Sequence, residues 1–452
     1  MTQGAGFVVA GTQSSVGKSS IAMGFLRLFK RNGLDVRPFK VGPDYIDPSH
    51  HARACGIPSY NLDSWMCTPQ YIHKLYDDVM GKGSFAVVEG VMGLFDGAHA
   101  KKNTGSTAEI AATLKLPIVL VVDGRAMARS VAAMVNGYVQ FDRNLRFLGV
   151  VANRVNRPGH AKILKEAIEH YTSIKFLGAL PDIPELKINN RHLGLFLGHE
   201  QSEKLYDRWA DHIEKHIDTD LVLKLVRNKT AAPGKPRMGN RWALKPRPFS
   251  VAIAKDEAFQ FVYQDTLDLF RYLGGNIKFF SPLRDRRLPE NIDWIYLPGG
   301  YPELYAKKLS SNRSMRSEIH RLGKSGMTIV GECGGLMYLG KSIISETNQK
   351  NDMVGLFNFS TSMEKKRLTL GYRRLRYKPA SGPIKGVLLK GHEFHFSRMI
   401  ENRETPQMTQ VEIRDGYRYN NCFALYSHAY WASSPQWLRL ILNTINSPGV
   451  KQ

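Results

Sequence analysis

Apolar runs rich in β-branched residues recur through the N-terminal part of the chain, and helical patterns separate them. The clearest runs cover residues 6–11, 85–90, 117–123 and 147–154. Such runs are typical of strands in a parallel sheet, where both faces of each strand are covered. Strands that alternate with helices predict a doubly wound parallel sheet, so we expect an α/β fold.

The first apolar run leads into the loop GTQSSVGKSS and then into a helical pattern, SSIAMGFLRLFKRNG. The usual phosphate-binding pattern, G-x-x-x-x-G-K-[ST], needs glycine at position 12, but Thr12 stands there and Gly11 precedes it. The order strand, loop, helix still directs backbone N–H groups and the helix dipole at a phosphate. Lys18 would reach the terminal phosphates, and Ser19 would bind Mg²⁺. We therefore predict a nucleotide site, against the alternative of a chance GKS in a basic chain.

Carboxylates follow several of these strands. Glu89 ends one strand and Asp96 lies in the loop beyond it, while Asp44 and Asp47 lie in the segment KVGPDYIDPSHH. Ligands of open α/β sheets bind at the carboxyl ends of the strands, so Glu89 is predicted to be a Mg²⁺ ligand. Asp123 ends a further strand, and for it a capping or turn role is an equally good interpretation.

The alternating pattern stops before residues 231–248, AAPGKPRMGNRWALKPRP, which are rich in proline, glycine and basic residues. This composition indicates a linker. We therefore predict one domain over residues 1–230 and a second over residues 249–452, where a new α/β series begins and a β-rich tail follows.

The second domain contains Cys333 in the segment TIVGECGGLMYLG, between an apolar strand and a helical run. The pattern G-x-C-x-G is the cysteine form of a nucleophile elbow, and the start of the following helix favours the thiolate. The glycine pair in YLPGGYPE is a candidate for part of an oxyanion hole, and His392, His395 and His428 are candidate bases. A buried structural cysteine is the alternative for Cys333 and the preferred interpretation of the other three cysteines.

The formal net charge is +23, which indicates either a nucleic-acid partner or a polyanionic substrate. Charged residues interrupt every apolar run before it reaches the length of a membrane span, and no signal-peptide pattern is present, so we expect no membrane partner. Four cysteines without metal-type spacing fit a reducing cytoplasm.

Taken together, the motifs resemble the cobyrinate a,c-diamide synthase family over nearly the whole chain. The matching segments are AGTQSSVGKSS, RPFKVGPDYIDPSHH, NLDSWM, VVEGVMGLFDG, GSTAEIA, RHLGL, LPGGYPEL, GECGGLMYLG and LGYR. That family joins a P-loop parallel-sheet synthetase domain, similar to dethiobiotin synthetase, to an α/β class I glutamine amidotransferase domain. The dethiobiotin-synthetase group has one additional residue in its phosphate loop, which implies that Gly11 is the first glycine of a longer loop.

The resemblance also implies roles for individual residues. It places ATP against the phosphate loop and Mg²⁺ on Ser19 and Glu89. It places three acidic residues near the transferred phosphate and the acceptor carboxylate. The implied nucleotide-binding residues are Gly11, Thr12, Val16, Gly17, Lys18, Ser19 and Ser20, and the acidic residues are Asp44, Asp47 and Asp96.

In the second domain, Cys333 matches the glutaminase nucleophile of the family. His428, in LYSHAYWASSP, matches the first histidine of the family segment YLHLHF, and Tyr430 replaces the second. The glutamate that commonly orients this histidine has no evident match. His392 and His395, in GHEFHFS, are interpreted as part of a shaped loop near the acceptor rather than as bases.

The implied reaction is the ATP- and glutamine-dependent amidation of the a and c acetate carboxylates of a tetrapyrrole such as cobyrinate. Hydrogenobyrinate, Ni-sirohydrochlorin and sirohaem remain open as acceptors. Polycarboxylate rings suit a basic protein, and residues 365–377, KKRLTLGYRRLRY, form either a wall of the acceptor site or a charged edge strand. A nucleic-acid-associated P-loop protein is disfavoured because Cys333 in an elbow occurs together with His428. A homodimer is one of the assembly states that the sequence leaves open.

Overall fold

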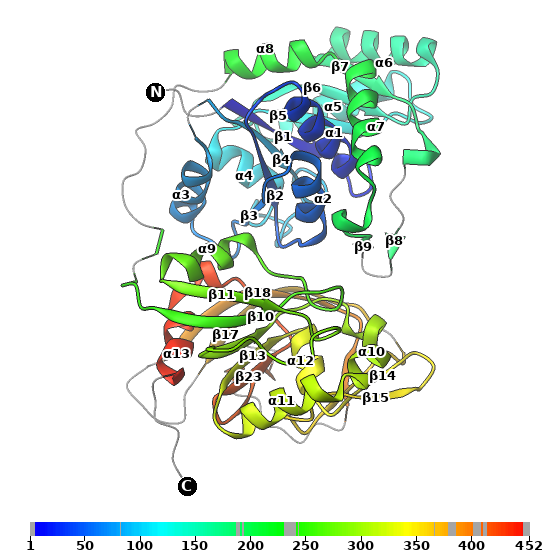
Figure 1. Ribbon diagram of the computed structural model, residues 1–452. Coiled ribbons are helices and arrows are strands. Elements are labelled where there is room, and N and C mark those ends of the chain that lie inside the picture. The colour runs from blue at the N-terminus through cyan, green and yellow to red at the C-terminus, as the bar shows by residue number, and fades with distance from the viewer. Residues whose placement is uncertain are drawn as a thin grey trace. The chain divides into compact units, whose positions relative to one another are not determined.

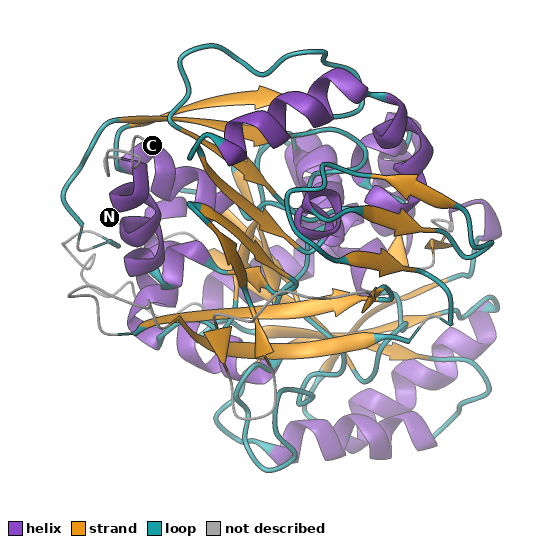
Figure 2. Cartoon of the chain, turned by 90° about the horizontal axis from the view of Figure 1, so that it is seen from below, coloured by secondary structure: helices purple, strands orange, loops and turns teal. Residues whose placement is uncertain are grey.

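A computed structural model describes residues 5–81, 83–186, 190–191, 194–229, 241–242, 244–365, 367–377, 386–400, 408–409 and 414–445. The chain divides into two compact units, Met1–Arg241 and Trp242–Gln452 (Figure 1). The division falls inside the predicted linker at 231–248, and most of that segment lies outside the described residues. Figure 2 shows strands gathered into sheets with helices packed against them.

A seven-stranded sheet in the order β3-β2-β4-β1-β5-β6-β7 forms the centre of the first unit, and every neighbouring pair is parallel. The predicted α/β fold is thereby confirmed. Because all seven strands run the same way, their carboxyl ends lie along one edge of the sheet. The strands are β1 (Ala5–Gly11), β2 (Val36–Val41), β3 (Tyr60–Leu62), β4 (Phe85–Glu89), β5 (Ile118–Asp123), β6 (Phe147–Asn153) and β7 (Lys175–Leu180).

Helices connect these strands and cover the sheet. Side chains of β1 such as Phe7 and Val9 join one buried cluster with residues of α1, α2, α7 and α8. The predicted helix after the phosphate loop is α1, whose capping residue Asn32 precedes Gly33 at φ 79°. The helices are α1 (Lys18–Arg31), α2 (Ile46–Cys55), α3 (Pro69–Val79), α4 (Thr107–Leu114), α5 (Ser130–Phe141), α6 (Pro158–Tyr171), α7 (Glu203–His216) and α8 (Thr219–Lys229).

The second unit has a six-stranded main sheet in the order β11-β10-β12-β13-β23-β22, parallel except for β22. Its strands are β10 (Phe249–Ala254), β11 (Gly275–Phe280), β12 (Trp294–Leu297), β13 (Thr328–Glu332), β22 (Tyr417–Tyr419) and β23 (Cys422–Leu425). Its helices are α9 (Gln264–Tyr272), α10 (Ala306–Ser311), α11 (Arg313–Lys324), α12 (Gly334–Leu339) and α13 (Pro435–Ile445).

The β-rich tail forms two smaller sheets, in the orders β15-β14-β16-β19 and β21-β20-β17-β18-β24. Their strands are β14 (Ser342–Ile344), β15 (Lys350–Asp352), β16 (Ser360–Ser362), β17 (Thr369–Tyr377), β18 (Val387–His395), β19 (Arg398–Ile400), β20 (Met408–Thr409), β21 (Arg414–Asp415) and β24 (His428–Ala429).

One interpretation of this region stays open and one was wrong. Residues 369–377 form β17, which pairs with β18 along nine residues but with β20 only at Arg376 and Tyr377, so among the described residues most of β17 has a neighbouring strand on one side only. His392 and His395 do not lie in a loop, because both belong to strand β18. Polar residues at buried strand positions had hidden the strand pattern of GHEFHF.

Within the described residues, no helix is long and apolar enough to cross a membrane. The four cysteines, Cys55, Cys67, Cys333 and Cys422, are all buried and form no disulfide.

Candidate active sites

The phosphate loop lies between β1 and α1 and is held by the end of β6. Gly17 has φ 102°, and a Cβ at this position would come within 2.2 Å of Asn153 Nδ2. The same Nδ2 atom donates a hydrogen bond to the carbonyl oxygen of Val16 at 2.8 Å. A side chain at position 17 is therefore excluded both by backbone conformation and by space. The loop runs from Gly11 to Gly17, with five residues between the two glycines.

Asp123 supports this loop indirectly. Its carboxylate pairs with Arg125 and with Arg154, each at 2.7 Å, and Arg154 also donates to the carbonyl oxygen of Ser15 at 2.7 Å. Burial acts to raise the Asp123 pKa, but hydrogen bonds from the two arginines lower it below its usual value. These contacts favour the structural interpretation of Asp123.

Lys18 begins helix α1 and is nearly buried. Its Nζ atom donates to the carbonyl oxygens of Gln13 at 3.2 Å and Met92 at 2.5 Å. Burial and the charge of Lys40 lower the Lys18 pKa to about 8. A bound phosphate would oppose this shift, because an anion stabilises the charged amine.

Glu89, at the carboxyl end of β4, is the centre of a buried polar cluster. Ser19 Oγ donates to Glu89 Oε1 at 2.7 Å, and Lys40 Nζ donates to the same oxygen at 2.8 Å. His51 Nε2 lies 2.6 Å from Glu89 Oε2. Burial acts to raise the Glu89 pKa, but Lys40 and His51 outweigh it and hold the pKa well below its usual value. Glu89 is therefore an ionised carboxylate that connects the phosphate loop to β2 and α2.

Lys40 is 3% exposed and neutralises this cluster. Its Nζ atom lies 2.6 Å from Asp47 Oδ2 and 4.0 Å from Asp44 Oδ2. Burial acts to lower the Lys40 pKa, but Asp47, Glu89 and Asp44 raise it above its ordinary value. Lys40 is therefore a buried ammonium ion.

The remaining predicted acids have local partners. Asp44 Oδ1 accepts hydrogen bonds from the backbone N–H groups of Ile46 at 2.7 Å and Asp47 at 3.1 Å, at the start of α2. Asp96 Oδ2 accepts from the N–H of Gly93 at 2.9 Å, and its charge acts to raise the Lys18 pKa. The structure thus brings Asp44 and Asp47 to Lys40, and Asp96 to the surroundings of Lys18.

The donor set around Ser19 fits a magnesium ion. The Ser19 hydroxyl and the Glu89 carboxylate are oxygen ligands 2.7 Å apart, and Mg²⁺ prefers oxygen ligands, with substrate phosphates and water completing its shell. Among the described residues, no group of three or more histidine, cysteine, aspartate or glutamate side chains is arranged to hold a metal by itself. The residues therefore fit a metal that arrives with a nucleotide.

In the second unit, Cys333 stands at a sharp turn between β13 and α12. Its backbone has φ 47° and ψ −102°, an unusual conformation for a residue with a side chain, as a nucleophile elbow requires. Its N–H donates to the carbonyl oxygen of Leu425 at 2.7 Å, at the end of the neighbouring strand β23.

The expectation that the start of helix α12 favours the Cys333 thiolate was wrong. Burial, followed by the charge of Glu303, raises the Cys333 pKa well above its usual value. Glu393 and Glu332 add to the rise, and the Gly334 N–H opposes it. The resting group is a thiol, so its use as a nucleophile requires a base.

His428 lies beside the predicted oxyanion glycines. A Cβ on Gly299 would come within 2.2 Å of His428 Cε1, so only glycine fits against the imidazole. A Cβ on Gly334, directly after Cys333, would come within 3.1 Å of the Gly300 nitrogen. The glycine pair after β12 therefore touches both the turn of Cys333 and the ring of His428.

Glu332, immediately before Cys333, is fully buried. It accepts hydrogen bonds from Tyr296 Oη at 2.9 Å and Trp431 Nε1 at 2.8 Å. Burial raises the Glu332 pKa to about 8. The residue connects β12, the elbow and the segment that follows His428.

Comparison with known proteins gives two family matches. Residues 7–195 match the CobQ/CobB/MinD/ParA nucleotide binding domain, and residues 250–436 match the CobB/CobQ-like glutamine amidotransferase domain. The cobyrinate a,c-diamide synthase of Salmonella typhimurium is 38% identical over 451 residues, which cover 96% of this chain and 96% of that protein. The chain belongs to the cobyrinate a,c-diamide synthase family.

Two further relatives also match the chain over more than nine tenths of its length. The cobyrinate a,c-diamide synthase of Listeria innocua is 39% identical and covers 95% of this chain and 96% of that protein. The hydrogenobyrinate a,c-diamide synthase of Brucella abortus is 39% identical and covers 91% of this chain and 93% of that protein. The resemblance predicted from the motifs is confirmed, and the family makes the chain a nucleotide-binding, glutamine-dependent ligase that forms amide bonds.

The sequence did not predict two members of the buried polar cluster around Glu89, namely Lys40 and His51. One signal was available, because Lys40 is a lone cation within the buried strand VRPFKV, and a buried lysine needs a partner. His51 offered no comparable signal, since its partner Glu89 is distant in the sequence.

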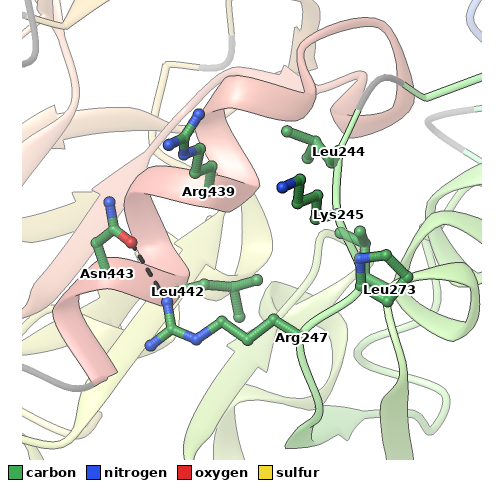
Figure 3. A pocket seen from close by; sticks show the side chains of 8 residues that line it. Leu244, Lys245, Arg247, Leu273, Arg439, Leu442 and Asn443 are labelled. Carbon is green, nitrogen blue, oxygen red and sulfur yellow. Dashed lines mark hydrogen bonds between the residues drawn. The ribbon is translucent and has the colours of Figure 1, made fainter.

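The second unit also has a cavity of about 670 Å³. Figure 3 shows the side chains that line it. It adjoins the residues that precede β10 and β11, at the amino ends of these strands, whereas Cys333 follows the carboxyl end of β13 in the same sheet. Its lining, as far as the described residues show it, has cations but no cysteine, so we do not assign glutaminase chemistry to it. The lining residues are Leu244, Lys245, Pro246, Arg247, Leu273, Arg439, Leu442 and Asn443.

Replacing Lys40 by methionine should abolish synthesis. The variant Lys40→Met leaves the buried carboxylates of Glu89 and Asp47 without their cation, so we expect ammonia-dependent amide formation to fall at least ~100-fold. Glutaminase activity, measured separately, should persist and show that the second unit is folded. Lys74→Met, which breaks the partly exposed pair with Asp78, is the matched control. Synthesis near the wild-type rate in Lys40→Met would refute the role of the cluster.

Replacing Gly299 by alanine tests the second site. The added Cβ overlaps the His428 ring, so glutamine hydrolysis should fall by about tenfold or more, while ammonia-dependent synthesis stays unchanged. Gly137→Ala, in α5 with open space around the new Cβ, is the control. Unchanged glutamine hydrolysis in Gly299→Ala would show that this contact does not set the position of His428.

Proposed function

We propose that the chain catalyses the ATP- and glutamine-dependent amidation of the a and c acetate carboxylates of cobyrinate. The observation that carries the proposal is the presence, in one chain, of the Ser19–Glu89–Lys40 cluster and the Cys333 elbow. A carboxylate is a poor acceptor for ammonia until its oxygen is converted into a good leaving group. The Ser19–Glu89–Lys40 cluster serves that activation, and the Cys333 elbow supplies ammonia.

The first unit activates the acceptor carboxylate as an acyl phosphate. Lys18 neutralises charge on the transferred phosphate, and the loop N–H groups hold the nucleotide. Ser19 and Glu89 would hold Mg²⁺, which would offset the negative charge of the phosphate. The positive charge of Lys40 offsets the negative charges of Glu89 and Asp47, which weakens their repulsion of the arriving anionic carboxylate.

The second unit releases ammonia from glutamine. His428 takes the Cys333 proton, and the sulfur attacks the side-chain amide carbon. The N–H groups near Gly299 and Gly300 stabilise the oxyanion. His428 then returns its proton to the nitrogen, and the tetrahedral intermediate expels ammonia to leave a glutamyl thioester. Water then attacks the thioester, glutamate departs and the thiol is restored.

The acceptor ring is the least constrained part of the proposal. The relatives in Salmonella and Listeria are named for cobyrinate, and the relative in Brucella is named for hydrogenobyrinate, at nearly the same identity. Incubation with cobyrinate, hydrogenobyrinate, Ni-sirohydrochlorin and sirohaem, followed by mass measurement of each ring, tests this choice. Conversion of two carboxylates to amides in cobyrinate alone is the expected result.

We further propose a cytoplasmic location, which the absence of disulfides among four buried cysteines supports. A homodimer stays a prediction, and light scattering of the purified chain tests it.

Separating the two activities by substitution tests the assignment of roles. Cys333→Ala should eliminate glutamine-dependent synthesis but retain ammonia-dependent synthesis at alkaline pH, because the sulfur serves only to liberate ammonia. Lys18→Ala should eliminate synthesis from either nitrogen source. Product formation is measured with glutamine and with ammonium chloride for both variants. Normal use of glutamine by Cys333→Ala would overturn the amidotransferase assignment.

Salt should weaken binding of the acceptor. The chain has a net charge of +23 and the ring is a polycarboxylate, so the KM for the ring should rise as ionic strength increases from about 0.05 M to about 0.5 M. The KM for glutamine, a zwitterion without net charge, is the internal control. A flat KM for the ring would show that the positive charge serves another partner.

A further inference from the structure

The ring of His428 is stacked on a second histidine. The His392 and His428 rings have centroids 4.9 Å apart and an interplanar angle of 14°. The two residues are also opposite each other in the antiparallel pairing of β18 with β24. Directly opposed residues have a fixed, short Cβ separation, so the stack is built on the backbone rather than on chance rotamers.

Two other groups lie close to the His428 ring. Phe261 lies 6.2 Å away at an angle of 50°. The backbone of Gly299 occupies the position from which a Cβ would reach His428 Cε1 at 2.2 Å. With His392 over its face and Gly299 at Cε1, the imidazole has little freedom to rotate.

His392 is itself anchored by a hydrogen bond to a tyrosine. Its Nδ1 atom shares a hydrogen bond of 3.2 Å with Tyr263 Oη, and the Tyr263 ring packs against Tyr430 at 4.8 Å. Tyr430 Oη donates to Asp265 Oδ2 at 3.0 Å, and Asp265 is 1% exposed. Tyr430, which replaces the second histidine of the family segment, thus belongs to the support of the stack.

The electrostatic surroundings keep both imidazoles neutral. Burial lowers the His428 pKa well below its usual value, and His392 and His395 lower it further. Burial and the charge of Arg373 lower the His392 pKa to about 3. A neutral imidazole is the form of a histidine that can accept the proton of a thiol.

We propose that His392 is a positioning residue for the release of ammonia, and that its flat face fixes the plane of the His428 ring. In a Cys-His-carboxylate arrangement, the carboxylate orients the base through a hydrogen bond. In this chain, ring stacking on a buried and anchored histidine constrains the plane of the His428 ring. The inference rests on the proposed role of His428 as the base.

The experiment compares two replacements of His392 that differ in shape. His392→Phe keeps an aromatic face against His428, whereas His392→Leu supplies apolar volume without a flat face. We measure kcat and KM for glutamine hydrolysis and, separately, ammonia-dependent synthesis. Leu389→Ala removes another buried side chain from β18 and controls for general damage to that strand.

We expect His392→Phe to keep kcat within about threefold of the wild type and His392→Leu to lose at least ~10-fold, mainly in kcat, because a misplaced base slows the chemical step. Leu389→Ala should retain kcat per folded molecule. Ammonia-dependent synthesis should be unchanged in all three variants, which shows that the synthetase site is intact.

Equal kcat values for the Phe and Leu variants, whether both high or both low, would overturn the positioning role. His428→Ala separates this failure from failure of the proposed function. If His428→Ala hydrolyses glutamine normally, the assignment of the base is wrong. If His428→Ala is inactive but His392→Leu is normal, only the positioning role is wrong.

Discussion

Parallel strands end at the same edge of a sheet, and this constraint fixes both sites. In the first unit, Val9 of β1 is paired with Glu89 of β4, and Lys40 of β2 is paired with Glu89 from the other side. In the second unit, Leu297 is paired with Gly331, and Glu332 with Leu425. Side chains that are distant in the sequence therefore emerge together, and strand register sets their spacing.

Buried charge is the main cost of the first site. Glu89 is completely buried and Lys40 nearly so, and removing such ions from water is unfavourable unless each has close partners. Ser19, Lys40 and His51 supply those partners for Glu89. Because Ser19 also belongs to the phosphate loop, the ionisation of Glu89 and the geometry of the loop are coupled through one hydrogen bond.

The parts of the molecule that the sequence predicted are those whose physical cause is local. The strand, the glycine-bounded loop and the helix of the phosphate site follow one another directly in the sequence. The residues of the Cys333 elbow are likewise adjacent in the sequence. The sequence did not predict Lys40 and His51 as site residues, because their common partner Glu89 belongs to another strand. His392 was misplaced in a loop because its strand shows no alternation of apolar and polar residues. The thiolate expectation for Cys333 failed because burial outweighs the short helix α12.

The two sites differ in charge: the first holds ionised groups, and the second holds neutral ones. Phosphoryl transfer needs fixed cations, so the first unit surrounds Lys40 with carboxylates that raise its pKa. Release of ammonia starts from a neutral base that takes the thiol proton, and in the second unit burial keeps both Cys333 and His428 in their neutral forms. A carboxylate beside His428 would orient the ring but would also stabilise its cation, which holds the proton more tightly. A stacked histidine constrains the plane of the ring without placing a negative charge beside it, so the geometry of the base is set separately from its pKa.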